Sequence, residues 1–295
     1  MCIRDSLSTS VRKIEQQLGY EIFDRSSSAL NLTEAGEAYV KAAQEILEIE
    51  KNLKDYLADM SELRSGHIVV SGSAFFSSYV LGPILKAFRE RYPGITVEFI
   101  EADSLRLYEE ALKSHIDLIV DGGGIDEALF EKHMLFQEHI LLGISLENPI
   151  CQQLPAEGMS VQDIRMGRHL SETTEGIDLA WLHNERFVLL KKGHDLYERA
   201  VALCRERDFE PKTDIHLNQL MTAYHSAINN LGCVFLSDTL AGKAEDGINM
   251  AYYKIKAENE GLLQRDVFIV HRKNRQVTRA MRTFIQVGRE LYHIY

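Results

Sequence analysis

A stretch without proline, from Thr33 to Ser65, carries the pattern that most constrains the fold of this chain. Apolar side chains recur in it at alternating spacings of three and four residues, the a/d pattern of a heptad repeat sustained over more than three repeats. Thr33 is suited to cap a helix, and Gly66 is suited to end it. The apolar positions are Tyr39, Ala42, Ile46, Ile49, Leu53, Tyr56, Met60 and Leu63.

A helix of about 31 residues extends roughly 47 Å, which is more than one face of a small domain covers. We therefore expect residues 33–65 to form a seam between subunits of a homodimer or homotetramer. The alternative is that the same apolar face packs against the following domain of its own chain.

Residues 6–18 form a second amphipathic pattern, with Leu7, Val11, Ile14 and Leu18 at helical spacing. Ser6 or Ser8 is predicted to cap this helix, and Gly19 to end it. The opposite face offers hydroxyls and cations suited to a DNA groove and its phosphates, from Ser8, Thr9, Arg12 and Lys13. The alternative for these residues is an ordinary solvated helix face.

The order of these residues resembles the second half of the winged helix-turn-helix of LysR-type transcriptional regulators. The resemblance is carried by Leu7, Ser8, Val11, Ile14, Glu15, Leu18, Gly19, Ile22, Phe23 and Arg25, followed by Leu32, Thr33, Ala35 and Gly36. It implies that the helix with Ser8, Thr9 and Arg12 enters the major groove and that Arg25 binds a phosphate. It also implies that residues 33–65 are the linker helix that pairs two subunits.

Two further helices precede this point in the family, whereas Met1 to Asp5 matches nothing in the family pattern. We expect the motif to be truncated here, and Leu7, Val11 and Ile14 to lack packing partners worth about 1.5–3 kcal/mol each when fully buried. The expectation is that these 295 residues bind DNA poorly.

From His67 the pattern changes to short apolar strands alternating with helices, which predicts a mainly parallel α/β sheet. The expected strands are 68–70, 95–100, 116–120, 187–190, 233–236 and 267–270, with another near Ile215. The expected helices include 79–92 and one containing Leu105, Leu107 and Leu112.

This order resembles the periplasmic-binding-protein-like effector domain of the same family, carried by Leu81 with Pro83, 92–94, 116–118, 187–193, 219–224 and 231–232. The resemblance implies three parts, a partial DNA-binding domain (1–32), a linker helix (33–65) and an effector domain (66–295). It also implies two subdomains in the third part, one of residues 67–142 with 260–295 and one of 143–259, joined by crossing strands.

Small ligands bind at the carboxyl ends of parallel strands, in the crevice between subdomains. Residues at such places are Ser73, Phe75, Ser104, Lys191, Gly193, His194, Thr222 and Tyr224. A free helix start near Ser73 favours an anion, so we expect a small organic anion as effector; the family resemblance also implies contact by Ser73. Alternatively, the serine and threonine hydroxyls cap helices and the lysine side chain is an ordinary solvated charge.

Enzyme and metal signatures are missing from the sequence. There is no GxSxG, HExxH or GxGxxG pattern, so we expect no catalytic residues, no cofactor and no metal site.

The scattered cysteines, Cys2, Cys151, Cys204 and Cys233, are expected to be reduced thiols. Apolar runs are too short for a bilayer, and the start lacks a signal peptide, so a cytoplasmic protein with no membrane partner is expected. The basic set Arg265, Arg272, Lys273, Arg275, Arg279 and Arg282 is expected to form an exposed face.

Two functions remain in competition at this point. The first is a DNA-binding regulator whose effector alters the arrangement of its subunits. The second is a headless small-molecule-binding protein with little DNA affinity, or an exported solute-binding module. The net charge of −11 argues against general binding to nucleic acid, so any DNA contact must be local.

Overall fold

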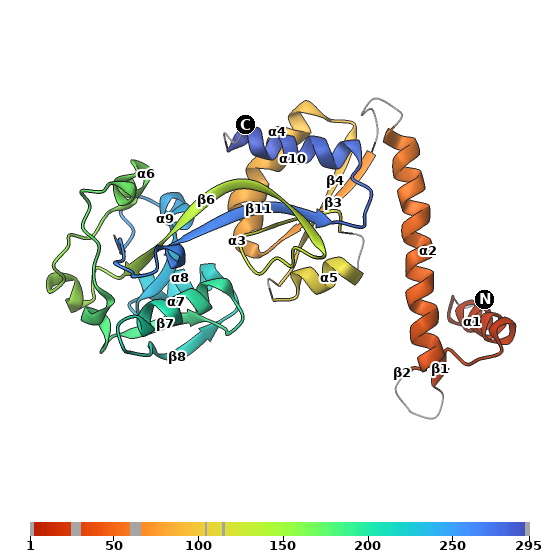
Figure 1. Cartoon of the computed structure of the whole chain (residues 1–295), viewed down its shortest axis with the longest axis horizontal. Helices are drawn as coiled ribbons and strands as arrows, with labels where there is room; N and C mark the ends of the chain where they lie inside the picture. Colours follow the sequence, from red (N-terminus) through yellow and green to blue (C-terminus); the bar gives the residue numbers. More distant parts are fainter. Residues whose placement is uncertain (1–2, 25–30, 60–65, 104, 114–115, 293–295) are drawn as a thin grey trace. The chain divides into compact units, whose positions relative to one another are not determined.

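The structure is a computed structural model that describes residues 3–24, 31–59, 66–103, 105–113 and 116–292 (Figure 1). It divides into two compact units, residues 1–60 and 61–295. No described helix combines the length and the apolarity that a membrane crossing needs.

The N-terminal unit contains two helices joined by a short hairpin. Helix α1 (Ile3–Leu18) is followed by strands β1 (Phe23–Asp24) and β2 (Asn31–Leu32), which pair antiparallel, and by helix α2 (Glu34–Asp59). The predicted caps at Ser6 or Ser8 are wrong, because α1 begins at Ile3 and both serines lie inside it. The predicted end is confirmed, since Gly19 follows α1 with a φ of +74°.

The link between α1 and α2 is held by contacts of the backbone at Ile22. The buried Glu15 carboxylate accepts the N–H groups of Ile22 (2.9 Å) and Phe23 (3.4 Å). The N–H of Thr33 donates to the carbonyl of Ile22 at 3.0 Å, and a Cβ added to Gly36 would lie 2.0 Å from the same oxygen. Glu15, Thr33 and Gly36 of the sequence pattern therefore fix the entry of the chain into α2.

Helix α2 begins as predicted. The Thr33 hydroxyl accepts the N–H of Gly36 at 2.9 Å, which is the hydrogen bond of an N-cap residue. The predicted apolar positions Ile46, Ile49 and Leu53 are 65%, 68% and 57% exposed. The helix is described as far as Asp59, and residues 60–65 of the predicted helix lie outside the described residues.

The second unit is built on one seven-stranded sheet of order β10-β6-β11-β5-β3-β4, with β9 pairing β6 as well. Strand β3 pairs parallel with β4 and β5, whereas β11 is antiparallel to β5 and β6. The bounds are β3 (Gly66–Gly72), β4 (Ile95–Glu101), β5 (Leu118–Asp121), β6 (Phe130–Ile144), β9 (Val234–Ser237), β10 (Ala251–Tyr253) and β11 (Gln264–Arg272). A separate parallel pair is β7 (Arg186–Leu190) with β8 (Lys212–Leu217).

Helices cover both faces of these strands. One continuous helical run comprises α3 (Ala74–Phe76), the π-helical turn η1 (Ser77–Leu81) and α4 (Gly82–Arg91). The others are α5 (Leu107–Lys113), α6 (Val161–Arg165), α7 (Asp195–Arg205), α8 (Leu220–Ile228), α9 (Asp238–Lys243) and α10 (Arg279–Leu291). Short 3₁₀ turns are η2 (Pro149–Gln152), η3 (Arg168–Leu170), η4 (Leu179–Leu182) and η5 (Glu260–Leu262).

The alternation of side chains in β3 explains why both faces need cover. Ile68 and Val70 belong to the main core, whereas Val69 packs on the other face with Leu107 of α5. On the first face α4 meets α10, where the rings of Phe88 and Phe284 lie 5.1 Å apart. A strand buried on both faces reads as a continuous apolar run, as the sequence here does.

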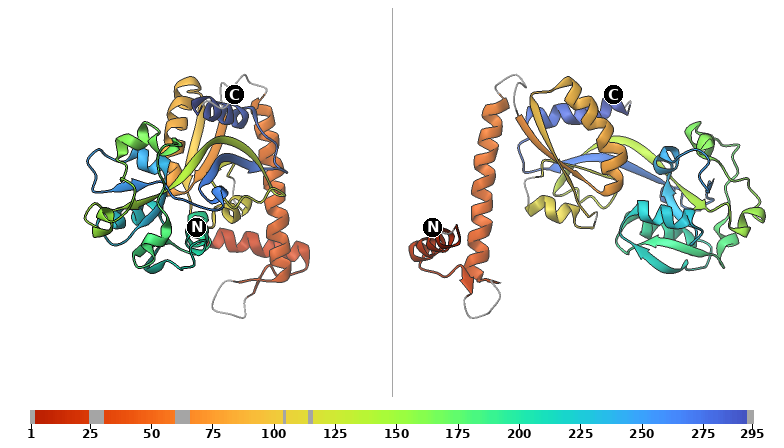
Figure 2. Two further views of the ribbon diagram at one scale, coloured as in Figure 1. Left: turned by 60° about the vertical axis from the view of Figure 1, so that its left-hand side comes forward. Right: turned by 180° about the vertical axis from the view of Figure 1, so that it is seen from behind.

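Strands β6 and β11 run from a first lobe into a second (Figures 1 and 2). From Phe130 to His139, β6 pairs with β11, and beyond this point Ile140 to Ile144 pair with β9 and β10. The predicted strand list lacked β10 and the whole of β6. The predicted subdomain limits at 142/143 and 259/260 fall within β6 and shortly before β11, and they stay a proposal.

The predicted exposed basic face is wrong in half of its members. Arg265, Arg272 and Arg275 are buried, at 7%, 8% and 4% exposure. Arg265 binds the buried Glu138 through Nε and Nη2 at 2.9 and 2.6 Å. Arg275 pairs with Asp117 and donates to the carbonyl of Ile116 at 3.1 Å, so acceptors inside the fold draw these two side chains inward. Lys273, Arg279 and Arg282 are exposed as expected.

Candidate functional site

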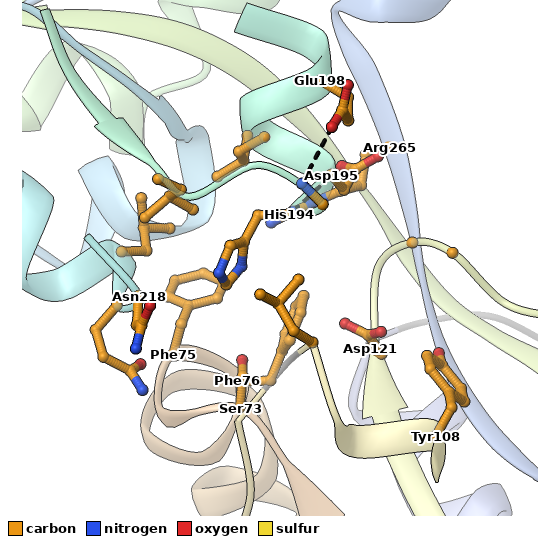
Figure 3. Close-up of a pocket in the computed structure, with 18 residues that line it drawn as sticks. Ser73, Phe75, Phe76, Tyr108, Asp121, His194, Asp195, Glu198, Asn218 and Arg265 are labelled. Atoms are coloured by element: carbon orange, nitrogen blue, oxygen red, sulfur yellow. Dashed lines mark hydrogen bonds and ion pairs between the residues drawn. The ribbon is translucent and has the colours of Figure 1, made fainter. Parts of the chain in front are cut away.

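A cavity of about 370 Å³ lies between the two lobes of the second unit (Figure 3). Residues that line it follow β3 (Ser73, Phe75, Phe76), β5 (Gly123, Gly124), β7 (Gly193, His194, Asp195) and β8 (Asn218, Gln219), and Arg265 comes from β11. Parallel strands that end at a crevice between lobes form the usual ligand position of an α/β fold.

The structure brings four of the predicted effector residues to this cavity and leaves others outside it. Ser73, Phe75, Gly193 and His194 line it. Lys191 is exposed and does not line it. Ser104 lies outside the described residues.

The predicted residues of α8 also lie away from the cavity. Tyr224 is buried, and its hydroxyl lies 2.7 Å from that of Tyr252. Thr222 is not among the lining residues. Asn218 and Gln219, which precede α8, line the cavity instead. Residues directly after β8 therefore predict the lining better than residues within α8.

One wall of the cavity is a helix start. Ser73 is extended (φ −66°, ψ 163°) and caps α3 without a side-chain hydrogen bond, so its hydroxyl is not used by the helix. The helical run from Ala74 to Arg91 leaves its first N–H groups without intrahelical acceptors, and its N-terminal end is electropositive. This wall suits an anionic group of a ligand.

Carboxylates line the cavity from both lobes, because Asp121 ends β5 beside the Ser73 end of β3, whereas Asp195 and Glu198 lie on α7 of the second lobe. Burial raises the pKa of Asp121 to about 6, although the N–H of Gly122, the Tyr108 hydroxyl and the charge of Arg265 act to lower it. Arg265 is itself engaged by Glu138, with Asp195 at 3.5 Å. These carboxylates suit hydrogen-bond donors or a positive charge rather than a second anionic group.

His194 and the chain around it complete the site. Burial lowers the pKa of His194, so its ring is neutral at neutral pH. The N–H of Gly193 donates to Oε1 of Glu198 at 3.1 Å, the dashed line in Figure 3, which holds the loop before α7. Gly193 adopts a φ of +97°, which favours glycine at this turn.

The predicted DNA-binding residues lie on α1. Ser8, Thr9, Arg12 and Lys13 are all exposed, and their spacing of four residues places them on one side of the helix. Val11 and Ile14 are half-buried. Arg25 lies outside the described residues.

Comparison with known proteins gives a consistent result. A family model described as the LysR substrate binding domain matches residues 61–165 and 167–292. The chain is 26% identical over 292 residues to the uncharacterized HTH-type transcriptional regulator YcgK of Bacillus subtilis, covering 97% of this chain and 85% of that protein.

Two solved structures share the fold. A full-length OxyR variant from Pseudomonas aeruginosa superposes with a TM-score of 0.69 at 20% identity, covering 97% of this chain and 88% of that one. Full-length CbnR complexed with its target DNA superposes with a TM-score of 0.63 at 16% identity, covering 97% and 89%. Because the matched family model spans most of the residues, the chain belongs to the LysR family of transcriptional regulators.

Proposed function

We propose that this chain regulates transcription by coupling occupancy of the cavity between its lobes to the arrangement of a DNA-bound oligomer. The observation that carries the proposal is the position of the cavity, which is lined by both lobes where two strands connect them. A ligand that contacts both lobes stabilises one relative position of the lobes over others. Such a shift reaches DNA if the subunits pair through α2, whose apolar positions are exposed.

The proposed DNA contact is the exposed side of α1 formed by Ser8, Thr9, Arg12 and Lys13, with Arg25 as a phosphate ligand. Hydroxyls and cations on one side of a helix suit base edges and phosphates in a major groove. The fold shared with CbnR, solved with its target DNA, supports this assignment. A role on DNA places the protein in the cytoplasm, and we assign it no catalytic reaction and no cofactor.

The proposed effector is a small organic molecule with an anionic group and, at its other end, a hydrogen-bond donor. The helix start at Ser73 suits the anionic group. Asp195 and Glu198 on α7 of the other lobe suit an amino or hydroxyl group, because carboxylates accept hydrogen bonds. An effector that is anionic at both ends would meet these carboxylates and bind less well.

Thermal unfolding with a panel of small acids tests the effector proposal. We expect amino or hydroxy acids to raise the midpoint more than plain carboxylates of equal length, since ligand binding stabilises the folded state. Ser73→Ala is expected to weaken binding about tenfold, the effect of one lost hydrogen bond to a charged group. Thr222→Ala, outside the cavity, is the matched control and should bind as the unchanged chain does. Equal responses of both variants would refute the site.

Gel-shift titration with the DNA upstream of the gene tests the regulatory proposal. Arg12→Ala is expected to weaken DNA binding. It should also reduce the slope of log affinity against log salt concentration by about one, because one phosphate contact is lost. Arg186→Ala, an exposed arginine of the second lobe paired with Asp214, serves as the control. If neither the protein nor its variants shift the DNA at any salt concentration, the headless small-molecule-binding alternative is favoured.

A further inference from the structure

Two buried imidazole nitrogens in the first lobe have no hydrogen-bond partner among the described residues. They are the Nε2 atoms of His133 on β6 and His271 on β11. The side chain of His271 is only 2% exposed. Buried polar atoms are nearly always hydrogen-bonded, so an unsatisfied pair at one place calls for a ligand, either water or an ion.

The register of β6 and β11 brings these rings together with a carboxylate. His271 is paired with Glu131 and Ile269 with His133, so Glu131, His133 and His271 lie on one face of the two strands. The rings of His133 and His271 lie 5.2 Å apart. The proximity follows from strand pairing and not from local spacing, which is why the sequence predicted no metal site.

The distances are too long for hydrogen bonds and suit an intervening ion. The Glu131 oxygens lie 3.9 Å from Nε2 of His133 and 3.8 Å from Nε2 of His271. Zinc binds imidazole nitrogen and carboxylate oxygen at about 2.0–2.2 Å, which separates the two ligand atoms by at most about 4.2 Å. A direct N–H···O hydrogen bond would require about 3.2 Å or less.

The tautomer of His271 is indicated by a backbone carbonyl beside its ring. Its Nδ1 lies 3.0 Å from the carbonyl oxygen of Arg272, and a carbonyl only accepts, so Nδ1 carries the proton. In this tautomer of the neutral ring, Nε2 presents a lone pair toward Glu131 and His133. A metal-binding histidine commonly donates its second ring N–H to such a carbonyl.

A second histidine cluster in the same unit has a simpler explanation. His139 Nδ1 and His169 Nε2 lie 3.1 and 3.0 Å from Oδ2 of Asp238, which is hydrogen-bonding distance. Asp238 is satisfied by these rings, and their hydrogen bonds help to lower its pKa to about 2, against the effect of its burial. The Glu131 cluster lacks such bonds, so the two clusters differ in what they require.

We propose that Glu131, His133 and His271 bind a divalent transition-metal ion of the zinc class, with at least one coordination position left to water or another ligand. Two imidazoles and a carboxylate are a ligand set that zinc accepts. Glu131 is 55% exposed and leaves a path for entry of the ion. Arg289 of α10, the helix that covers this face, places a positive charge near His133. The Glu131 carboxylate offsets that charge.

Bound metal would join β6 to β11 within the first lobe, on the strands that continue into the second. Because the ion binds the folded arrangement and the ligands are far apart in the unfolded chain, it stabilises the folded state. The site is separate from the cavity between the lobes, since none of its ligands lines that cavity.

Equilibrium dialysis of the full chain against Zn²⁺, with visible absorption of Co²⁺ as a second readout, tests the proposal. We expect about one ion per chain and a Co²⁺ spectrum typical of imidazole ligation. His271→Gln and His133→Gln are expected to lower the affinity at least tenfold, the size found even for outer-shell changes. Glu131→Gln should do the same with unchanged circular dichroism, because its side chain is exposed.

Two control variants make the outcome decisive. His67→Gln removes an exposed cross-strand histidine that lies 3.3 Å from Glu98 but has no second imidazole, and it should bind zinc as the unchanged chain does. His169→Gln alters the other cluster and should also bind normally. No binding by the unchanged chain, or loss in His169→Gln with retention in His271→Gln and Glu131→Gln, would overturn the proposal.

Discussion

Gly36 lies at the contact between the start of α2 and the backbone of Ile22, where there is no space for a side chain. Its backbone passes so close to the carbonyl of Ile22 that an added Cβ would lie 2.0 Å from that oxygen. Real Cβ contacts are far longer, so the backbone of one segment would have to move. This contact joins the chain after α1 to the first turn of α2. The geometry of the N-terminal unit therefore requires glycine at position 36.

Gly36→Ala is expected to destabilise the N-terminal unit by about 1–3 kcal/mol, the usual cost of forcing atoms into a packed site. Hydrogen exchange of amides in α1 would report the loss. Gly82→Ala is the control, because its Cβ would lie 3.8 Å from the nearest atom and alanine favours a helix. Equal exchange in both variants would show that the junction adapts without cost.

Asp121 predicts a pH dependence of stability. Burial raises its pKa from 3.8 to about 6, so the folded state holds a proton that the unfolded state has lost between these values. Stability from this group is therefore fully present below about pH 4 and lost as pH rises through about 6. Urea unfolding of Asp121→Asn should lack this fall, and the difference between the two proteins should change over that range. A constant difference from about pH 4 to about pH 7 would contradict the raised pKa.

The residues of the cavity could be predicted only where they follow an apolar strand. Ser73, Gly193 and His194 stand directly after such runs, and all three line the cavity. Asp195 and Arg265 also line it, but their roles depend on an ion pair between distant segments. Tyr224 was predicted for its hydroxyl, which is used inside the fold by Tyr252. Sequence position indicates where a strand ends, and it does not indicate which way a helical side chain points.

Helix α2 presents the clearest unpartnered surface among the described elements. Ile46, Ile49 and Leu53 are more than half exposed along a heptad pattern. Apolar residues repeated in this way are buried when two helices pair. The pattern and its exposure together favour pairing of two copies of the chain.

Ile49→Glu should shift the protein from dimer toward monomer, because a charge buried in the seam costs several kcal/mol. Light scattering after size exclusion would measure the mass. Gln44→Glu adds the same charge to α2 outside the heptad positions and should leave the mass unchanged. A monomeric unchanged protein, or an Ile49→Glu dimer of equal affinity, would refute pairing through α2.

Strand β6 shows why some elements escaped prediction. Residues 130–139 contain several charged and histidine side chains, which favour a loop or helix in isolation. Glu138 is fully buried there because Arg265 of β11 binds it, and this partner is remote in sequence. By contrast, β3 and β5 contain the continuous apolar runs 68–70 and 118–120, whose burial the sequence indicates directly.

The two lobes share β6 and β11, so the sheet of each lobe is completed by strands that continue into the other. Loss of packing in one lobe should therefore lower the stability of both. Trp181 is the sole tryptophan and lies in η4 of the second lobe, so its fluorescence reports that lobe.

Leu135→Ala, at a fully buried position of β6 within the first lobe, is expected to destabilise by about 2–5 kcal/mol. If the lobes unfold together, the urea midpoint of Trp181 fluorescence falls by the corresponding amount. Leu146→Ala, at a position 59% exposed, should change this midpoint little. An unchanged Trp181 midpoint in Leu135→Ala would mean that the lobes unfold independently.

The shared strands also set an order for biosynthesis. Strand β5 gains its second neighbour only when residues 264–272 emerge from the ribosome, and α10 covers the sheet later still. The first lobe is thus begun before the second lobe is made and is completed after it. Until then an open strand edge and an uncovered apolar face are exposed, the features that promote aggregation. A message that ends before residue 264 would therefore yield two unfinished lobes.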